Sequence, residues 1–222
     1  MKKAGLQPRA EFLIAFGVGT GGIGLATVGF AADSMSGLCG VALSSALGLM
    51  GFTWALTAGN SLSRATLLQM DPPERPLPGW RLAGAIGGML ALSHLLRLVP
   101  GTTGAQAGSR IARIDSLLAQ ASGPELLAAV LALALAPALA EELLFRGLLL
   151  GRLKSSLGTG TALVLSSLLF GAIHLDFAQG AAAVVLGLYL GALTLGTGST
   201  HAAILCHGAN NLAAIGAARW MN

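Results

Sequence analysis

The apolar segments of this chain are long enough to cross a lipid bilayer, and they make up most of its 222 residues. A helix needs about 20 apolar residues to span the hydrocarbon core of a membrane. The sequence predicts seven such spans, at about 12–32, 37–58, 82–100, 125–150, 160–177, 180–197 and 200–219. We therefore expect an all-α fold, a polytopic membrane helix bundle that forms one integral membrane domain over residues 1–222.

Composition supports the lipid bilayer as the environment and argues against nucleic acid as a partner. Only 10% of the residues are charged and the mean hydropathy is +0.75, whereas soluble domains carry about 25% charged residues. The net charge of +4 comes from basic residues spread over loops and helix ends, without a basic patch that contains aromatic residues. Cys39 and Cys206 lie in different apolar runs, so we interpret them as packing residues.

The distribution of basic residues predicts the orientation in the membrane. The apolar run 12–32 is too long for a signal-peptide core, so we expect it to remain as a first membrane helix. With a cytoplasmic N-terminus, eight basic residues fall on the cytoplasmic side and three on the other. The short Ala/Gly/Leu-rich chain is typical of bacteria, and the expected location is the bacterial inner membrane.

Connections and glycine spacings give further local expectations. Residues 59–81 contain DPPERPLPGW, which no helix can run through, and 101–124 contain the amphipathic stretch RIARIDSLLAQ, which suits a membrane interface. GxxxG spacings at Gly17/Gly21, Gly84/Gly88 and Gly187/Gly191 indicate close helix packing.

Ionisable residues inside the apolar runs are the candidates for function. A charge at the bilayer centre costs about 2.5–3.5 kcal/mol on insertion scales. Glu142 and Arg146 are four residues apart, so they share a helix face and can pair, while Glu141 is rotated about 100° away. An unpaired carboxylate in a dry site suits a general base or acid. The structural alternative is an ion-pair cluster that only locks the bundle.

Two further pairs with helical spacing lie in later spans. His174 follows Phe170 by four residues, and its predicted depth in the membrane is similar to that of Glu141. His207 and Asn211 also share a face, and both can donate hydrogen bonds to a developing oxyanion. Taken alone, His174 could be a hydrogen-bonded core residue, and His207 with Asn211 could be polar contacts between helices.

In this order, EELLFR (141–146), FGAIH (170–174) and HGANN (207–211) resemble the EExxxR, FxxxH and HxxxN motifs of the CAAX protease and bacteriocin-processing (CPBP) family. The resemblance covers about 124–215, which would carry the catalytic core. It implies that Glu141 and His174 activate a water molecule, that His207 and Asn211 stabilise the oxyanion, and that Glu142, Arg146 and Phe170 support the site. It also implies a membrane-embedded or lipid-anchored protein or peptide substrate.

The sequence leaves alternatives open for the metal dependence and for the class of function. We expect no cofactor, but Glu141, His174 and His207 could instead supply three ligands to Zn²⁺. Bacterial members of the family suggest several substrate types, including the C-terminal tails trimmed by myxosortase-type enzymes. Buried Glu, His and Arg also build proton- or ion-coupled transporters. A non-catalytic membrane immunity or scaffold protein is the third reading.

Overall fold

The computed structural model describes residue 20 and residues 34–58, 60–98, 110–174 and 176–220, and these described residues form helices and loops without a strand. Within them, three helices are long and apolar enough to cross a membrane: Met35–Thr57, Pro124–Leu157 and Phe177–Thr197. The chain is thus an all-α membrane helix bundle. The predicted first span, 12–32, lies outside the described residues apart from Thr20, so the count of seven stays a prediction.

The first part of the described chain contributes helices α2 (Met35–Thr57), α3 (Arg64–Leu67) and α4 (Gly79–Leu98). The Ser34 side chain caps α2 by accepting a hydrogen bond from the Gly37 amide at 3.2 Å. The proline-rich stretch 72–78 interrupts the chain as predicted, and α4 starts directly after it. The short helix α3 within this connection was not predicted.

One continuous helical rod, Pro124–Leu157, carries the first motif. It consists of α6 (Pro124–Ala129), the π-helical segment η1 (Val130–Leu135), α7 (Ala136–Glu142), the π-helical segment η2 (Leu143–Leu149) and α8 (Leu150–Leu157). The predicted span ended at 150. Instead the helix runs to Leu157, because the next residue that interrupts it is Gly158, whose φ is 79°.

Three helices follow this rod: α9 (Thr159–Ala172), α10 (Phe177–Thr197) and α11 (His201–Trp220). The predicted span 160–177 was too long, because α9 ends at Ala172 and the Asp176 side chain caps α10, accepting from the Gln179 amide at 2.8 Å. The amphipathic stretch forms the predicted helix, α5 (Arg110–Gln120).

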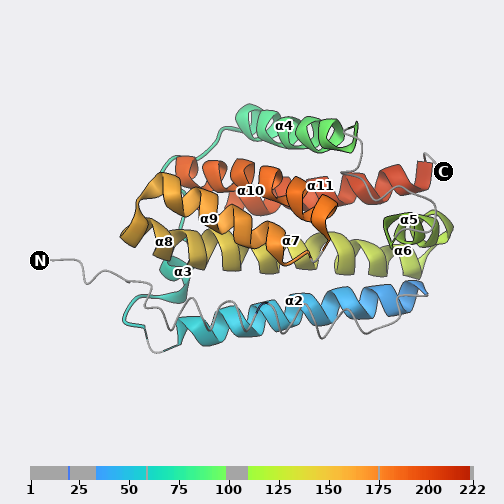
Figure 1. The fold of residues 1–222 in the computed structure, drawn as a ribbon, viewed down its shortest axis with the longest axis horizontal. Helices are drawn as coiled ribbons and strands as arrows, with labels where there is room; N and C mark the ends of the chain where they lie inside the picture. Colours follow the sequence, from blue (N-terminus) through green and yellow to red (C-terminus); the bar gives the residue numbers. More distant parts are fainter. Residues whose placement is uncertain (1–19, 21–33, 59, 99–109, 175, 221–222) are drawn as a thin grey trace, which may run out of the picture.

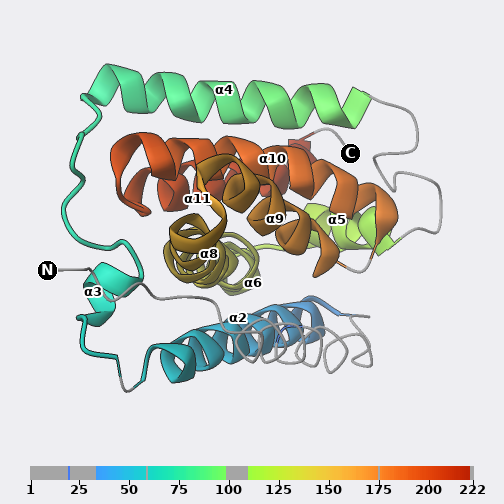
Figure 2. The same ribbon diagram turned by 60° about the vertical axis from the view of Figure 1, so that its left-hand side comes forward.

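The helices are arranged in layers around the rod (Figures 1 and 2). Helix α2 packs on one side of the rod, and α9, α10 and α11 pack on the other. Helix α4 is outermost and lies against α10 and α11. The rod therefore occupies the middle of the bundle, and its Glu142 and Arg146 side chains are fully buried.

Glycines let these helices approach closely. A Cβ added at Gly171 in α9 would lie 2.6 Å from the Gly180 carbonyl oxygen in α10. A Cβ at Gly191 would lie 2.5 Å from the Leu163 side chain, and one at Gly187 would lie 3.1 Å from Arg146 Nη2. The predicted packing role of Gly187 and Gly191 is confirmed. Of the earlier pair only Gly88 meets a neighbour, and Gly17/Gly21 lie outside the described residues.

Candidate active site

The predicted pair between Glu142 and Arg146 forms, and it is fully buried. Arg146 Nη1 donates to Glu142 Oε1 at 3.0 Å, and neither residue is exposed. Removing two charges from water is costly, and their attraction offsets this cost only when the geometry is good and further hydrogen bonds are made. Glu142 gains one such bond from α11, described next. The Glu142–Arg146 pair thus forms the side of the site that solvent does not reach.

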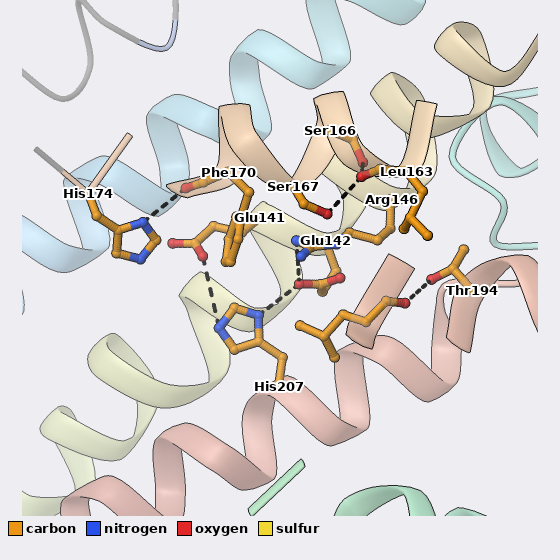
Figure 3. Close-up of polar contacts among 11 residues, drawn as sticks. Glu141, Glu142, Arg146, Leu163, Ser166, Ser167, Phe170, His174, Thr194 and His207 are labelled. Atoms are coloured by element: carbon orange, nitrogen blue, oxygen red, sulfur yellow. Dashed lines mark hydrogen bonds and ion pairs between the residues drawn. The ribbon is translucent and has the colours of Figure 1, made fainter. Parts of the chain in front are cut away.

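His207 joins the two adjacent glutamates (Figure 3). Its Nδ1 lies 2.8 Å from Glu142 Oε1, and its Nε2 lies 3.9 Å from Glu141 Oε2. We expected Glu141 to point elsewhere because it is rotated away from Glu142. The imidazole ring instead fits between the two carboxylates, with one ring nitrogen toward each. With Glu142 ionised, Nδ1 carries a proton and donates it, so Nε2 is the nitrogen available for chemistry.

Phe170 is the apolar centre around which the polar groups are arranged. Its ring makes edge contacts with the rings of His174 and His207, at centroid distances of 5.2 and 5.9 Å. The Arg146 guanidinium lies 4.1 Å from the ring centroid, a cation–π contact. Because Phe170 touches groups from α9, α11 and the rod, it fixes their spacing and keeps this side of the cluster dry.

His174 lies in the turn after α9, and not within a membrane helix as predicted. The four-residue spacing from Phe170 still matters, because His174 Nδ1 lies 3.0 Å from the Phe170 carbonyl oxygen. This contact makes Nδ1 the donor and leaves Nε2 free to accept. In Figure 3 the Glu141 carboxylate lies between the rings of His174 and His207. Glu141 is partly accessible, with 15% of its side chain exposed, unlike Glu142.

Asn211 is one turn from His207 on α11, as its spacing predicts, but its contact is with the rod. Its Nδ2 lies 3.5 Å from the carbonyl oxygen of Ala134 in η1. Among the described residues, no contact joins Asn211 to either glutamate. The structure thus brings Glu141, Glu142, Arg146, Phe170, His174 and His207 together and leaves Asn211 at the edge of the group.

Sequence reasoning missed the two π-helical segments that bracket the glutamates. Pro137 has no amide hydrogen, so it cannot bond the carbonyl four residues earlier, and this residue was a visible signal for η1. Gly147 lies within η2, where the backbone of Leu68 comes close. Single π-helical turns occur often at functional sites because the extra residue changes which side chains share a face.

A zinc site at Glu141, His174 and His207 would need the three side chains to converge on one point. Within the described parts of the chain, no three His, Cys, Asp or Glu side chains gather closely enough to hold a metal ion. This arrangement does not fit a three-ligand zinc site, and we derive no step through a metal.

The fold and the site describe a helical membrane protein with an acid–histidine cluster inside its bundle. Residues 123–213 match the family model for type II CAAX prenyl endopeptidases, described as Rce1-like. The matched segment covers less than half of the chain, and it is similar to the CAAX protease (CPBP) family, which is a family of membrane peptidases. No curated protein sequence and no solved structure matches the chain. The matched segment contains all seven predicted site residues: Glu141, Glu142, Arg146, Phe170, His174, His207 and Asn211.

Proposed function

We propose that this protein is an intramembrane endopeptidase that uses Glu141 and His174 to activate water. The observation that supports this most directly is the position of the Glu141 carboxylate, between two imidazole rings and next to the buried Glu142–Arg146 pair. Water and substrate can reach the partly accessible carboxylate of Glu141, whereas Glu142 is buried and bonded to Arg146 and His207, so Glu141 is the glutamate placed to act as a general base.

In the proposed reaction, Glu141 removes a proton from water while the water oxygen forms a bond to the peptide carbonyl carbon. His174 orients that water through Nε2. The carbonyl oxygen becomes an oxyanion, which is stabilised by two hydrogen-bond donors: Asn211, and His207 as an imidazolium that donates Nδ1–H to Glu142 and Nε2–H to the oxyanion. When the C–N bond breaks, Glu141 transfers the proton to the leaving amine. Glu142 accepts from Nδ1 of His207 and so holds the ring in a fixed orientation.

The proposed substrate is a membrane-embedded or lipid-anchored protein or peptide. The matched family is named for prenyl endopeptidases, which cut proteins that carry a lipid. The site lies on helices in the middle of an apolar bundle, so a substrate held in the bilayer reaches it more readily than a soluble one. The distribution of basic residues supports a cytoplasmic N-terminus, and the short Ala/Gly/Leu-rich sequence supports a bacterial inner membrane as the location.

The test is a comparison of membrane proteomes from cells that express the wild type, Glu141→Ala or Glu125→Ala. Glu125 is a matched control, because it is an exposed glutamate in the first turn of the same helical rod. Fragments that depend on Glu141 but not on Glu125 would establish proteolysis and identify the cut site. The same fragments in all three strains would contradict the proposal and favour a transporter or a scaffold.

Dialysis against a chelator extends the same test to the metal question. We expect purified enzyme to cleave the identified substrate equally well before and after the treatment. Loss of cleavage that is restored by Zn²⁺ alone would overturn the metal-free mechanism and leave the peptidase assignment intact.

A further inference from the structure

Gln69 lies outside the matched family segment, yet it contacts the rod at the site. Its Nε2 lies 2.7 Å from the Arg146 carbonyl oxygen and 3.0 Å from the Gly147 carbonyl oxygen. These contacts join residues that are 77 and 78 positions apart in the sequence. Both acceptors lie in η2, directly after the glutamate pair.

The π-helical segment explains why donors are needed at this position. The Leu150 amide donates to the Phe145 carbonyl, five residues back, and the helix then returns to α geometry. In the π-helical segment each amide donates to the carbonyl five residues earlier, and in the α-helix that follows it donates to the carbonyl four residues earlier. Where the first pattern changes to the second, one carbonyl is left without an amide donor. A buried carbonyl without a donor is costly. The side-chain amide of Gln69 supplies the missing donor.

The backbone of Gln69 is held by a second part of the site. Its carbonyl oxygen accepts hydrogen bonds from the Thr200 amide at 2.9 Å and from the Ser199 hydroxyl at 3.1 Å. Ser199 and Thr200 directly precede α11, the helix that carries His207. One residue therefore links the start of α11 to η2, with its main chain on one side and its side chain on the other.

The conformation of Gln69 shows that this arrangement is specific. Its φ is 52°, the left-handed region that residues other than glycine and asparagine rarely adopt, and it is the only described non-glycine residue with positive φ. Such a conformation persists only where surrounding contacts impose it. The four hydrogen bonds above are the contacts that impose it.

We propose that Gln69 is a positioning residue for the peptidase site, an inference that rests on the proposed function. By fixing the Arg146 backbone, it sets where the guanidinium meets Glu142. By anchoring the residues before α11, it sets the depth at which His207 meets the same carboxylate. The loop between α3 and α4 thereby acts on the reaction without touching the substrate.

The test replaces Gln69 with methionine, which has a similar length but no donor. The matched control is Gln120→Met, because Gln120 donates to the Ser116 carbonyl within α5, away from the site. With the substrate found through Glu141-dependent fragments, we expect Gln69→Met to lower kcat about ten-fold, with KM within about two-fold, since small displacements of catalytic groups are costly. Gln120→Met should change neither.

A spectroscopic measurement decides the proposal even if the protein proves not to be a peptidase. The protein has four histidines, so ¹⁵N-histidine labelling gives few ring signals, and His207→Gln assigns one of them. Gln69→Met should shift or broaden the His207 signal and leave the His94 signal unchanged. If kcat and the His207 signal both match those of Gln120→Met, the proposal is wrong, even if Gln69→Met lowers thermal stability.

A second variant covers the case in which Gln69→Met does not fold. Gln69→Asn keeps an amide and suits the positive φ, but its side chain is one methylene shorter and cannot reach both carbonyls. We expect Gln69→Asn to change kcat and the His207 signal in the same direction as Gln69→Met, but by less. Wild-type values for both would overturn the role of the side-chain contact.

Discussion

Glu141 and Glu142 are adjacent in the sequence, but they belong to regions of the site with different properties. Glu142 is fully buried and bonded to Arg146 and His207, whereas Glu141 is partly accessible and faces the space between two histidines. A buried carboxylate that is paired with an arginine serves structure, because changing its protonation would leave the arginine unbalanced. A partly accessible charge can exchange protons. Burial therefore separates a structural carboxylate from a reactive one.

The largest difference between the two regions should appear in activity after Glu141→Gln. We expect cleavage to fall by about 10³-fold, because the variant loses the general base but keeps the shape of the side chain. The melting temperature in detergent should stay close to that of the wild type. Single-turnover cleavage and thermal unfolding of the same preparation measure both. Retained cleavage would show that another residue is the general base and that Glu141 is not the reactive carboxylate.

Folding stability should fall most for Glu142→Gln, which leaves the guanidinium of Arg146 buried without a counter-charge. Breaking a buried pair in this way costs about 3–5 kcal/mol of folding free energy. Glu141→Gln is the matched control, since it makes the same chemical change one residue away. Equal unfolding curves for the two variants in the same detergent would show that burial does not distinguish the two glutamates.

A smaller effect should follow from Gly147→Ala, which tests how tightly the loop holds the buried region. An added Cβ would lie 2.5 Å from the Leu68 carbonyl oxygen, so the loop or η2 must move. Overpacking of this kind costs about 1–3 kcal/mol. Gly87→Ala in α4 is the control, because no atom lies within 4 Å of the new Cβ and alanine favours helix by about 0.5–1 kcal/mol. Two variants with equal unfolding temperatures would show that the contact is not tight.

The parts of this arrangement that depend on local spacing could be predicted from the sequence. Residues four apart on a helix share a face, so the bond between Glu142 and Arg146 followed from their positions. The contact of His174 with the Phe170 carbonyl depends on the same spacing. The all-α bundle followed from the length of the apolar runs. Which of these residues catalyse the reaction stays a prediction.

What escaped prediction depends on contacts between distant segments or on helix geometry that composition does not record. An apolar run looks the same whether its helix is α or π, so η2 was not predicted, and Pro137 was the one signal for η1. Gln69 lies in a loop with no motif, and nothing near it in sequence indicates that it reaches Arg146. The end of α9 was placed too late because apolar residues continue past Ala172, although Asp176 is a typical cap residue.

The smallest expected effect concerns Asp115 in α5, a carboxylate outside the membrane-spanning helices. Partial burial raises its pKa above the ordinary value of 3.8, and Arg97 offsets part of that rise. A folded-state pKa above the unfolded one gives stability that is present at low pH and is lost as the pH rises through the folded-state value. The wild type should therefore unfold at a slightly lower temperature above about pH 4, and Asp115→Asn should not show this decrease. The corresponding change in the free energy of unfolding is at most about 0.5 kcal/mol at this half-exposed site. Unfolding curves of both proteins between pH 3 and pH 7 measure the slope, and an unchanged slope in the variant would show that burial at this site does not affect the carboxylate. Cleavage by Asp115→Asn should equal that of the wild type, because this carboxylate has no contact with the site.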